Sequence, residues 1–193
     1  MPGALRLLVA ALPLALLAAA ACGGIGVGVH DQGRPVLDDG APGEVGATAR
    51  ATLAAPDGQV MGEVTLTQAP SGVLISAAVT GLAPGAHGFH IHGSGACSPD
   101  FTAAGSHFAP GGEPHGFLHE DGPQAGDLPN IHVGEDGKGR ADYFTAAVTL
   151  DAGPEHSLFD EDGSAFIVHA DPDDYLDVAS AGARIACGVV ERG

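Results

Sequence analysis

The 193-residue chain has no tryptophan, and its aromatic residues are limited to seven phenylalanines and two tyrosines. By contrast, it contains 31 glycines and 14 prolines. This balance argues against a fold built of long helices and favours many short elements joined by turns. The composition therefore predicts an all-β protein.

Cations are also scarce. Seven Lys and Arg stand against 24 Asp and Glu, for a formal net charge of −17, and no Lys or Arg occurs between Ala51 and Gly137. Such an acidic chain without a basic patch excludes nucleic acid as a partner. The sequence also lacks a glycine-rich phosphate loop and a serine-nucleophile motif.

The N-terminal apolar run, from Leu7 to Ala21, is too short for a comfortable membrane span. With Arg6 before it and small residues at its end, it predicts a signal peptide over residues 1–22. Cys22, followed by two glycines, resembles a bacterial lipoprotein processing site. We therefore predict a lipidated Cys22 and a protein anchored to the cell-envelope membrane. The alternative is a plain signal peptide, cut nearby, and a secreted protein.

Only three cysteines are present, and exported proteins usually pair their thiols. If Cys22 carries lipid, Cys97 and Cys187 remain to form one disulfide. Two buried free thiols are the alternative.

Domain organisation follows from composition and periodicity. Residues 23–46 are glycine-rich, acidic and without hydrophobic periodicity, which predicts a flexible linker. Residues 47–193 predict one domain. Its alternating segments and turn sequences predict a Greek-key β-barrel or sandwich of about eight antiparallel strands with long loops. The predicted strands are 47–53, 59–68, 73–79, the strand that carries His90 and His92, 130–134, 140–150, 164–169 and 183–190.

Histidine is the informative residue type. Side chains two apart in a strand point the same way, so His90 and His92 can bind one ion, although an H-x-H pair alone is a weak signal. His107 and His115 follow in the long segment between His92 and Pro129, where a loop of that length is usually functional. His169 completes an ordered set that indicates a histidine-rich copper site.

Six motifs then resemble the copper,zinc superoxide dismutase family, in order and at similar spacing, over residues 47–190. They are GFHIH at 88–92, AGSHF at 104–108, HG at 115–116, GDLPN at 126–130, FIVH at 166–169 and GARIACG at 182–188.

The resemblance implies a cofactor and the residues that hold it. It implies copper bound by His90, His92, His107 and His169, with His107 also bridging to zinc, and zinc bound by His107, His115 and Asp127. It further implies that Asp173 holds a copper histidine and a zinc histidine in orientation through hydrogen bonds. Four imidazoles suit copper in both oxidation states.

The chain departs from the family at Gln124, where relatives carry a third zinc histidine. Two substitutes are open: Gln124 binds through its oxygen, or His119 supplies the missing donor. Because an amide oxygen is a poor replacement for imidazole at zinc, we predict a copper-only or zinc-weakened site.

The activity that the resemblance implies is conversion of two superoxide anions to dioxygen and hydrogen peroxide by copper redox cycling. In it, His107 carries a proton and Arg184 attracts the anionic substrate. The alternative is an exported copper carrier or buffer with little turnover. The sequence leaves the oligomeric state open.

Overall fold

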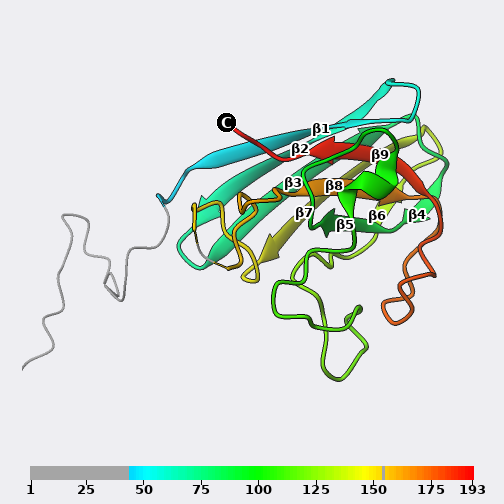
Figure 1. Ribbon diagram of the computed structural model, residues 1–193. Helices are drawn as coiled ribbons and strands as arrows, with labels where there is room; N and C mark the ends of the chain where they lie inside the picture. The colour runs from blue at the N-terminus through cyan, green and yellow to red at the C-terminus, as the bar shows by residue number, and fades with distance from the viewer. Residues whose placement is uncertain (1–43, 154) are drawn as a thin grey trace, which may run out of the picture. The chain divides into compact units, whose positions relative to one another are not determined.

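A computed structural model describes residues 44–153 and 155–193 (Figure 1). The chain divides into two units, residues 1–40 and 41–193, and the described residues all belong to the second. The predicted signal peptide, Cys22 and the linker up to residue 43 lie outside the described residues and stay predictions. Within the described part of the chain, no helix is long and apolar enough to cross a membrane.

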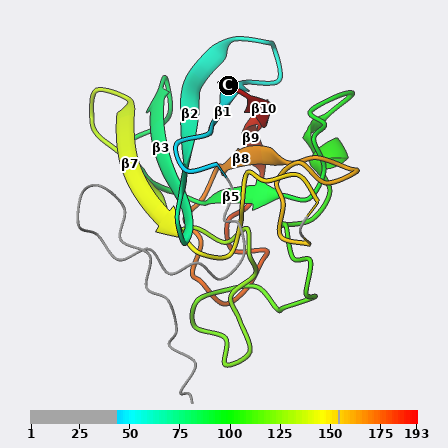
Figure 2. The same ribbon diagram turned by 90° about the vertical axis from the view of Figure 1, so that its left-hand side faces the viewer.

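The described residues form one antiparallel sheet that curls into a nearly closed barrel (Figure 2), which confirms the predicted fold class. Hydrogen-bonded neighbours follow the order β4-β6-β7-β3-β2-β1-β9-β8-β5, and β10 also pairs with β1. The strands are β1 Thr48–Ala54, β2 Val60–Ala69, β3 Gly72–Thr80, β4 Gly85–His87, β5 Phe89–His92, β6 Ile131–Val133, β7 Lys138–Thr145, β8 Ala165–His169, β9 Arg184–Val189 and β10 Glu191–Arg192. One short 3₁₀ helix, η1, covers Phe101–Ala104.

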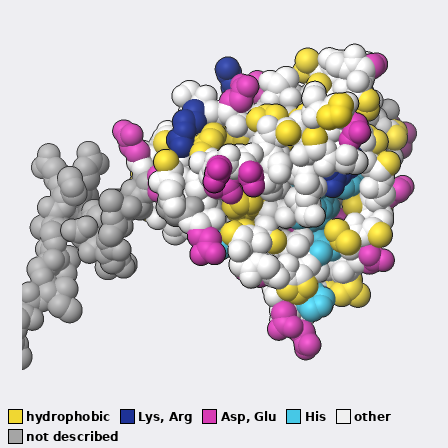
Figure 3. All heavy atoms as spheres, in the orientation of Figure 1, with side chains coloured by type: hydrophobic (Ala, Val, Ile, Leu, Met, Phe, Trp, Pro, Cys, Tyr) yellow, Lys and Arg dark blue, Asp and Glu magenta, His cyan; other side chains and the backbone are white. Residues whose placement is uncertain are grey.

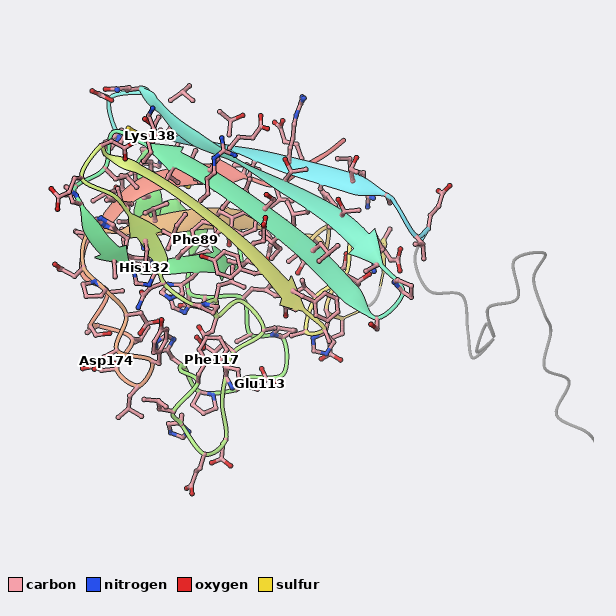
Figure 4. The ribbon with its side chains drawn as sticks, turned by 180° about the vertical axis from the view of Figure 1, so that it is seen from behind. Phe89, Glu113, Phe117, His132, Lys138 and Asp174 are labelled. Atoms are coloured by element: carbon pink, nitrogen blue, oxygen red, sulfur yellow. A yellow bond between two sulfur atoms is a disulfide. The ribbon has the colours of Figure 1, made fainter. Side chains whose placement is uncertain are left out.

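Alternation of side chains explains why these segments form strands with one face inside. In β1, Ala49, Ala51 and Leu53 are buried while the residues between them are mainly exposed. An antiparallel strand with one face in the core and the other in solvent is expected to show this alternation of buried and exposed side chains. At the centre, Phe89 stacks on Phe166 with ring centroids 5.2 Å apart, and Figure 4 shows its side chain between the strands.

The predicted strand 140–150 is wrong at both ends. β7 begins at Lys138 and stops at Thr145. Beyond it the chain turns toward the buried side chain of Gln68, whose Oε1 accepts hydrogen bonds from the Leu150 backbone N–H at 2.8 Å and the Thr149 hydroxyl at 3.1 Å. A buried amide must be satisfied, and one of its partners is the Leu150 backbone N–H, which a continuing strand would have used elsewhere. The short strands β4 and β10 were not predicted.

Strand β5 pairs with β8 along one edge, and loops rather than another strand lie along its other edge. On that edge the Ile91 N–H donates to the Gly126 carbonyl, and the Phe108 N–H donates to the Ile91 carbonyl, both at 2.9 Å. The loops that follow β5 and precede β6 therefore run along the strand that carries His90 and His92. Figure 4 shows how far they extend from the barrel, with Phe117 among them.

A predicted disulfide joins Cys97 to Cys187 across 90 residues and is confirmed. Cys187 lies in β9, and Cys97 lies in the loop after β5. Beneath the bond a small second core forms, in which Ala104 packs with Ala165 and Ile167 on the outer face of β8. The disulfide therefore holds the η1 loop against the outside of the barrel.

Replacing both cysteines with serine is expected to lower the free energy of unfolding by about 4 kcal/mol, because the unfolded chain regains the freedom of a 90-residue loop. Urea unfolding of residues 23–193, which contain no other cysteine, measures the difference. Equal unfolding midpoints for the two proteins would contradict this role of the disulfide.

Candidate metal centre

Four buried histidines converge beside strand β5. Candidate ligand atoms of His90, His92, His107 and His169 all lie within 4.8 Å of one another. His90 and His92 point to the same side of β5, as the two-residue period predicts, while Phe89 and Ile91 point into the core. His169 ends β8, where a register shift between Val168 and His169 re-aims the strand.

Three of these imidazoles have one nitrogen bonded and the other without a hydrogen-bond partner in the part of the chain that the structure describes. His92 Nδ1 lies 3.0 Å from the Gly105 carbonyl, and His169 Nδ1 lies 3.2 Å from the Gly182 carbonyl. Because a carbonyl only accepts, these nitrogens carry the protons. His90 Nε2 donates in the same way to the Asp173 carboxylate at 2.7 Å.

The remaining nitrogens are lone-pair donors turned into the site. His90 Nδ1, His92 Nε2 and His169 Nε2 are buried and have no hydrogen-bond partner among the described residues. Leaving such atoms unsatisfied costs about 1–3 kcal/mol each, so their clustering calls for a ligand that accepts electron pairs. An all-imidazole donor set of this kind fits copper.

Electrostatics keep these imidazoles neutral. Burial lowers the pKa of His92 to about 2 and that of His169 to about 4, and it also lowers the pKa of His90. Burial alone would raise the pKa of Asp173, but hydrogen bonds from His90 and from the Tyr175 backbone N–H outweigh it, and the net shift is downward. At neutral pH the site therefore offers neutral nitrogens beside an ionised carboxylate.

A second group of donors adjoins the first and shares His107. His107 Nδ1 and His115 Nδ1 each lie 2.9 Å from the same oxygen, Oδ1 of Asp127. The other oxygen of Asp127 accepts the Gly116 backbone N–H at 2.8 Å. Gly116 has φ +103°, and a Cβ there would meet the Tyr175 carbonyl oxygen at 2.1 Å, so only glycine fits this turn.

The position of the absent third zinc histidine lies beside this second group. Gln124 lines the same cavity as His107 and His115. His119 is not a member of either donor group, and its Nδ1 accepts the Asp121 backbone N–H at 3.2 Å. Two imidazoles and one carboxylate leave zinc one donor short of its usual four, so the chain does not provide the family's full zinc site.

Asp173 connects the two groups. Its Oδ2 contacts His90 Nε2, and its Oδ1 lies 3.1 Å from His115 Nε2. Sequence reasoning missed what holds this carboxylate: Asn130 donates to the Asp173 carbonyl and accepts its N–H, both at 2.9 Å. Asn130 ends the GDLPN motif, which was the available signal.

Arg184 lies at the mouth of the site. It lines a cavity of about 420 Å³ together with His92, His107 and His169. Its guanidinium donates to the carbonyls of Phe101 and of Gly105, the latter at 2.7 Å. These bonds fix its orientation, and Figure 3 shows cation and histidine surface close together on a face that also carries carboxylates.

Comparison with known proteins agrees with this geometry. The family model described as copper/zinc superoxide dismutase matches residues 60–190. The chain belongs to the copper/zinc superoxide dismutase family.

Its relatives include two bacterial proteins at the same level of identity. Superoxide dismutase [Cu-Zn] 2 of Aquifex aeolicus is 44% identical over 74% of this chain and 85% of its own length. Superoxide dismutase [Cu-Zn] of Caulobacter vibrioides is 44% identical over 75% of this chain and 86% of its own length. The crystal structure of a SOD-like protein from Bacillus subtilis superposes with a TM-score of 0.69 at 39% identity, covering 72% of this chain and 96% of that one.

Asp173→Asn is expected to weaken copper binding about 10–100-fold, because the amide cannot accept from both imidazoles as the carboxylate does. Competition against a chelator of known affinity measures the change. Asp171→Asn is the matched control, since it removes the same charge from the same exposed loop without touching a histidine. Equal losses in the two variants would mean that charge rather than orientation is responsible.

Proposed function

We infer that this chain is a superoxide dismutase that uses copper held by His90, His92, His107 and His169. The reaction consumes two superoxide anions and two protons and yields dioxygen and hydrogen peroxide. The observation that carries this proposal is the cluster of three buried imidazole nitrogens without partners in the described chain, two of them on His92 and His169, which line a cavity together with Arg184. Copper, when bound there, supplies a one-electron redox couple.

The chain's own residues do the remaining work. Arg184 binds and orients the anion at the cavity mouth, where its guanidinium is already fixed by two carbonyls. His107 has Nδ1 held at Asp127, so Nε2 is the atom that faces the copper group, and we assign to that atom the proton delivered to product. His90, His92 and His169 hold their tautomers through the partners of their other nitrogens.

The copper-carrier alternative is not favoured. A carrier needs the histidines but has no use for an arginine fixed beside them, and Arg184 is present and oriented. The relatives that bear the name superoxide dismutase match most of the chain.

Arg184→Ala is expected to lower kcat/KM for superoxide at least about tenfold, because the cavity loses the cation that draws the substrate in. Pulse radiolysis or stopped-flow decay of superoxide measures it, with copper content determined for each sample. Arg192→Ala is the control, since it removes a cation from β10. A rate unchanged in the Arg184 variant would remove that residue from the mechanism.

Electrostatic steering is expected to be weak. The chain has net charge −17, and the loop between His169 and Arg184 carries exposed Asp171, Asp174 and Asp177. A superoxide anion is therefore repelled by the chain as a whole, and Arg184 is the cation that lines the cavity of the site. We expect an association rate that is slow for the family and does not fall steeply as salt is added. A fast rate that drops sharply with ionic strength would contradict this.

We further propose that the protein is exported and anchored through lipid on Cys22. The N-terminal pattern supports export, and the Cys97–Cys187 disulfide suits an oxidising compartment. Cys22→Ala is expected to move the protein from the membrane fraction to the soluble fraction. A wild-type protein found soluble, with an N-terminus other than residue 22, would favour a plain signal peptide.

A further inference from the structure

The second donor group is one ligand short. His107 Nδ1, His115 Nδ1 and Asp127 Oδ1 converge, with the two nitrogens each 2.9 Å from that oxygen. Zinc in proteins is almost always bound by four donors, mainly nitrogen and sulfur, with carboxylate oxygen as the third type. Which atom completes this group decides how firmly it holds a metal ion.

Gln124 has an atom that suits this position. Its Oε1 is buried and has no hydrogen-bond partner within residues 44–153 and 155–193. The residue lines the cavity that His107 and His115 also line. Its backbone N–H donates to Asp127 Oδ2 at 3.0 Å, which fixes residue 124 against the carboxylate of the group. A buried acceptor without a donor, on a residue that lines the cavity with His107 and His115 and is bonded to Asp127, indicates a ligand.

We propose that Gln124 Oε1 is the fourth donor of this second site, and that the resulting set of two imidazoles and two oxygens binds zinc weakly and exchangeably. A neutral amide oxygen is a weaker donor to zinc than the imidazole that relatives have there. The inference rests on the proposed function only in that the two sites share His107.

Hydrogen bonds within the protein hold the residues of the second site together. Asp127 bonds both imidazoles through one oxygen and two backbone N–H groups through the other. His115 is also held at its second nitrogen by Asp173, which in turn orients His90. Hydrogen bonds therefore link the second site to the copper histidines, and we expect copper to bind with the same stoichiometry when zinc is absent.

The experiment measures zinc affinity by competition with a chromogenic chelator, using residues 23–193 loaded with copper and reduced to Cu(I). Wild type is compared with Gln124→His, Gln124→Ala and His119→Ala. We expect Gln124→His to bind zinc at least about 100-fold more tightly than wild type and Gln124→Ala to bind it about tenfold more weakly. His119→Ala, the control in the same loop, should equal wild type.

Cobalt(II) provides a second measurement that a merely structural role would not change. Its visible spectrum at the second site should differ between wild type and Gln124→Ala, while Cu(I) contributes no d–d absorption. One copper per chain in every variant shows that the protein has folded. Wild type binding zinc as tightly as Gln124→His, or zinc lost in His119→Ala but not in Gln124→Ala, would overturn the proposal. Superoxide turnover, measured separately, tests the proposed function independently of these results.

Discussion

The rest of the structure depends on burying several imidazoles with their lone pairs unpaired. His90, His92 and His169 each bond a carbonyl or carboxylate through one nitrogen, and the other nitrogen has no hydrogen-bond partner among residues 44–153 and 155–193. Such an arrangement opposes folding unless neighbouring elements fix it and a metal ion satisfies it. The features around the site can be understood as that support: a loop along the edge of β5, a disulfide beneath η1, and a carboxylate that bonds two rings.

The same supports place the substrate-binding cation. Arg184 comes from β9, three residues before the half-cystine Cys187, and it is held by carbonyls of the loop that the disulfide fastens. Gly105 serves both purposes, because its carbonyl accepts from His92 and from Arg184. One backbone oxygen atom therefore fixes the position of His92, a copper ligand, relative to Arg184, the anion-binding residue. In a chain so acidic, a displaced Arg184 would leave the cavity without attraction for an anion.

Much of this could be predicted from the sequence, and what could not has physical reasons. The alternation of apolar residues gave most strands, and the two-residue period placed His90 and His92 on one side. The predicted strand 140–150 extends too far at its C-terminal end, because the chain after Thr145 turns to bond the buried amide of Gln68, which is distant in sequence. Whether His119 approaches the second site depends on loop conformation, on which periodicity carries no information. Asp173 came from family resemblance. Of its two supports, Asn130 was marked only as the end of the GDLPN motif, and the Tyr175 backbone N–H has no side-chain signal in the sequence.

The central claim is that one copper ion in the four-histidine group makes this chain an enzyme. The direct measurement is superoxide decay as copper is titrated into metal-free protein containing residues 23–193. We expect activity to rise in proportion to copper and to stop rising at one ion per chain. Tight binding of one copper ion with no acceleration of superoxide decay would contradict it and identify the site as a copper carrier.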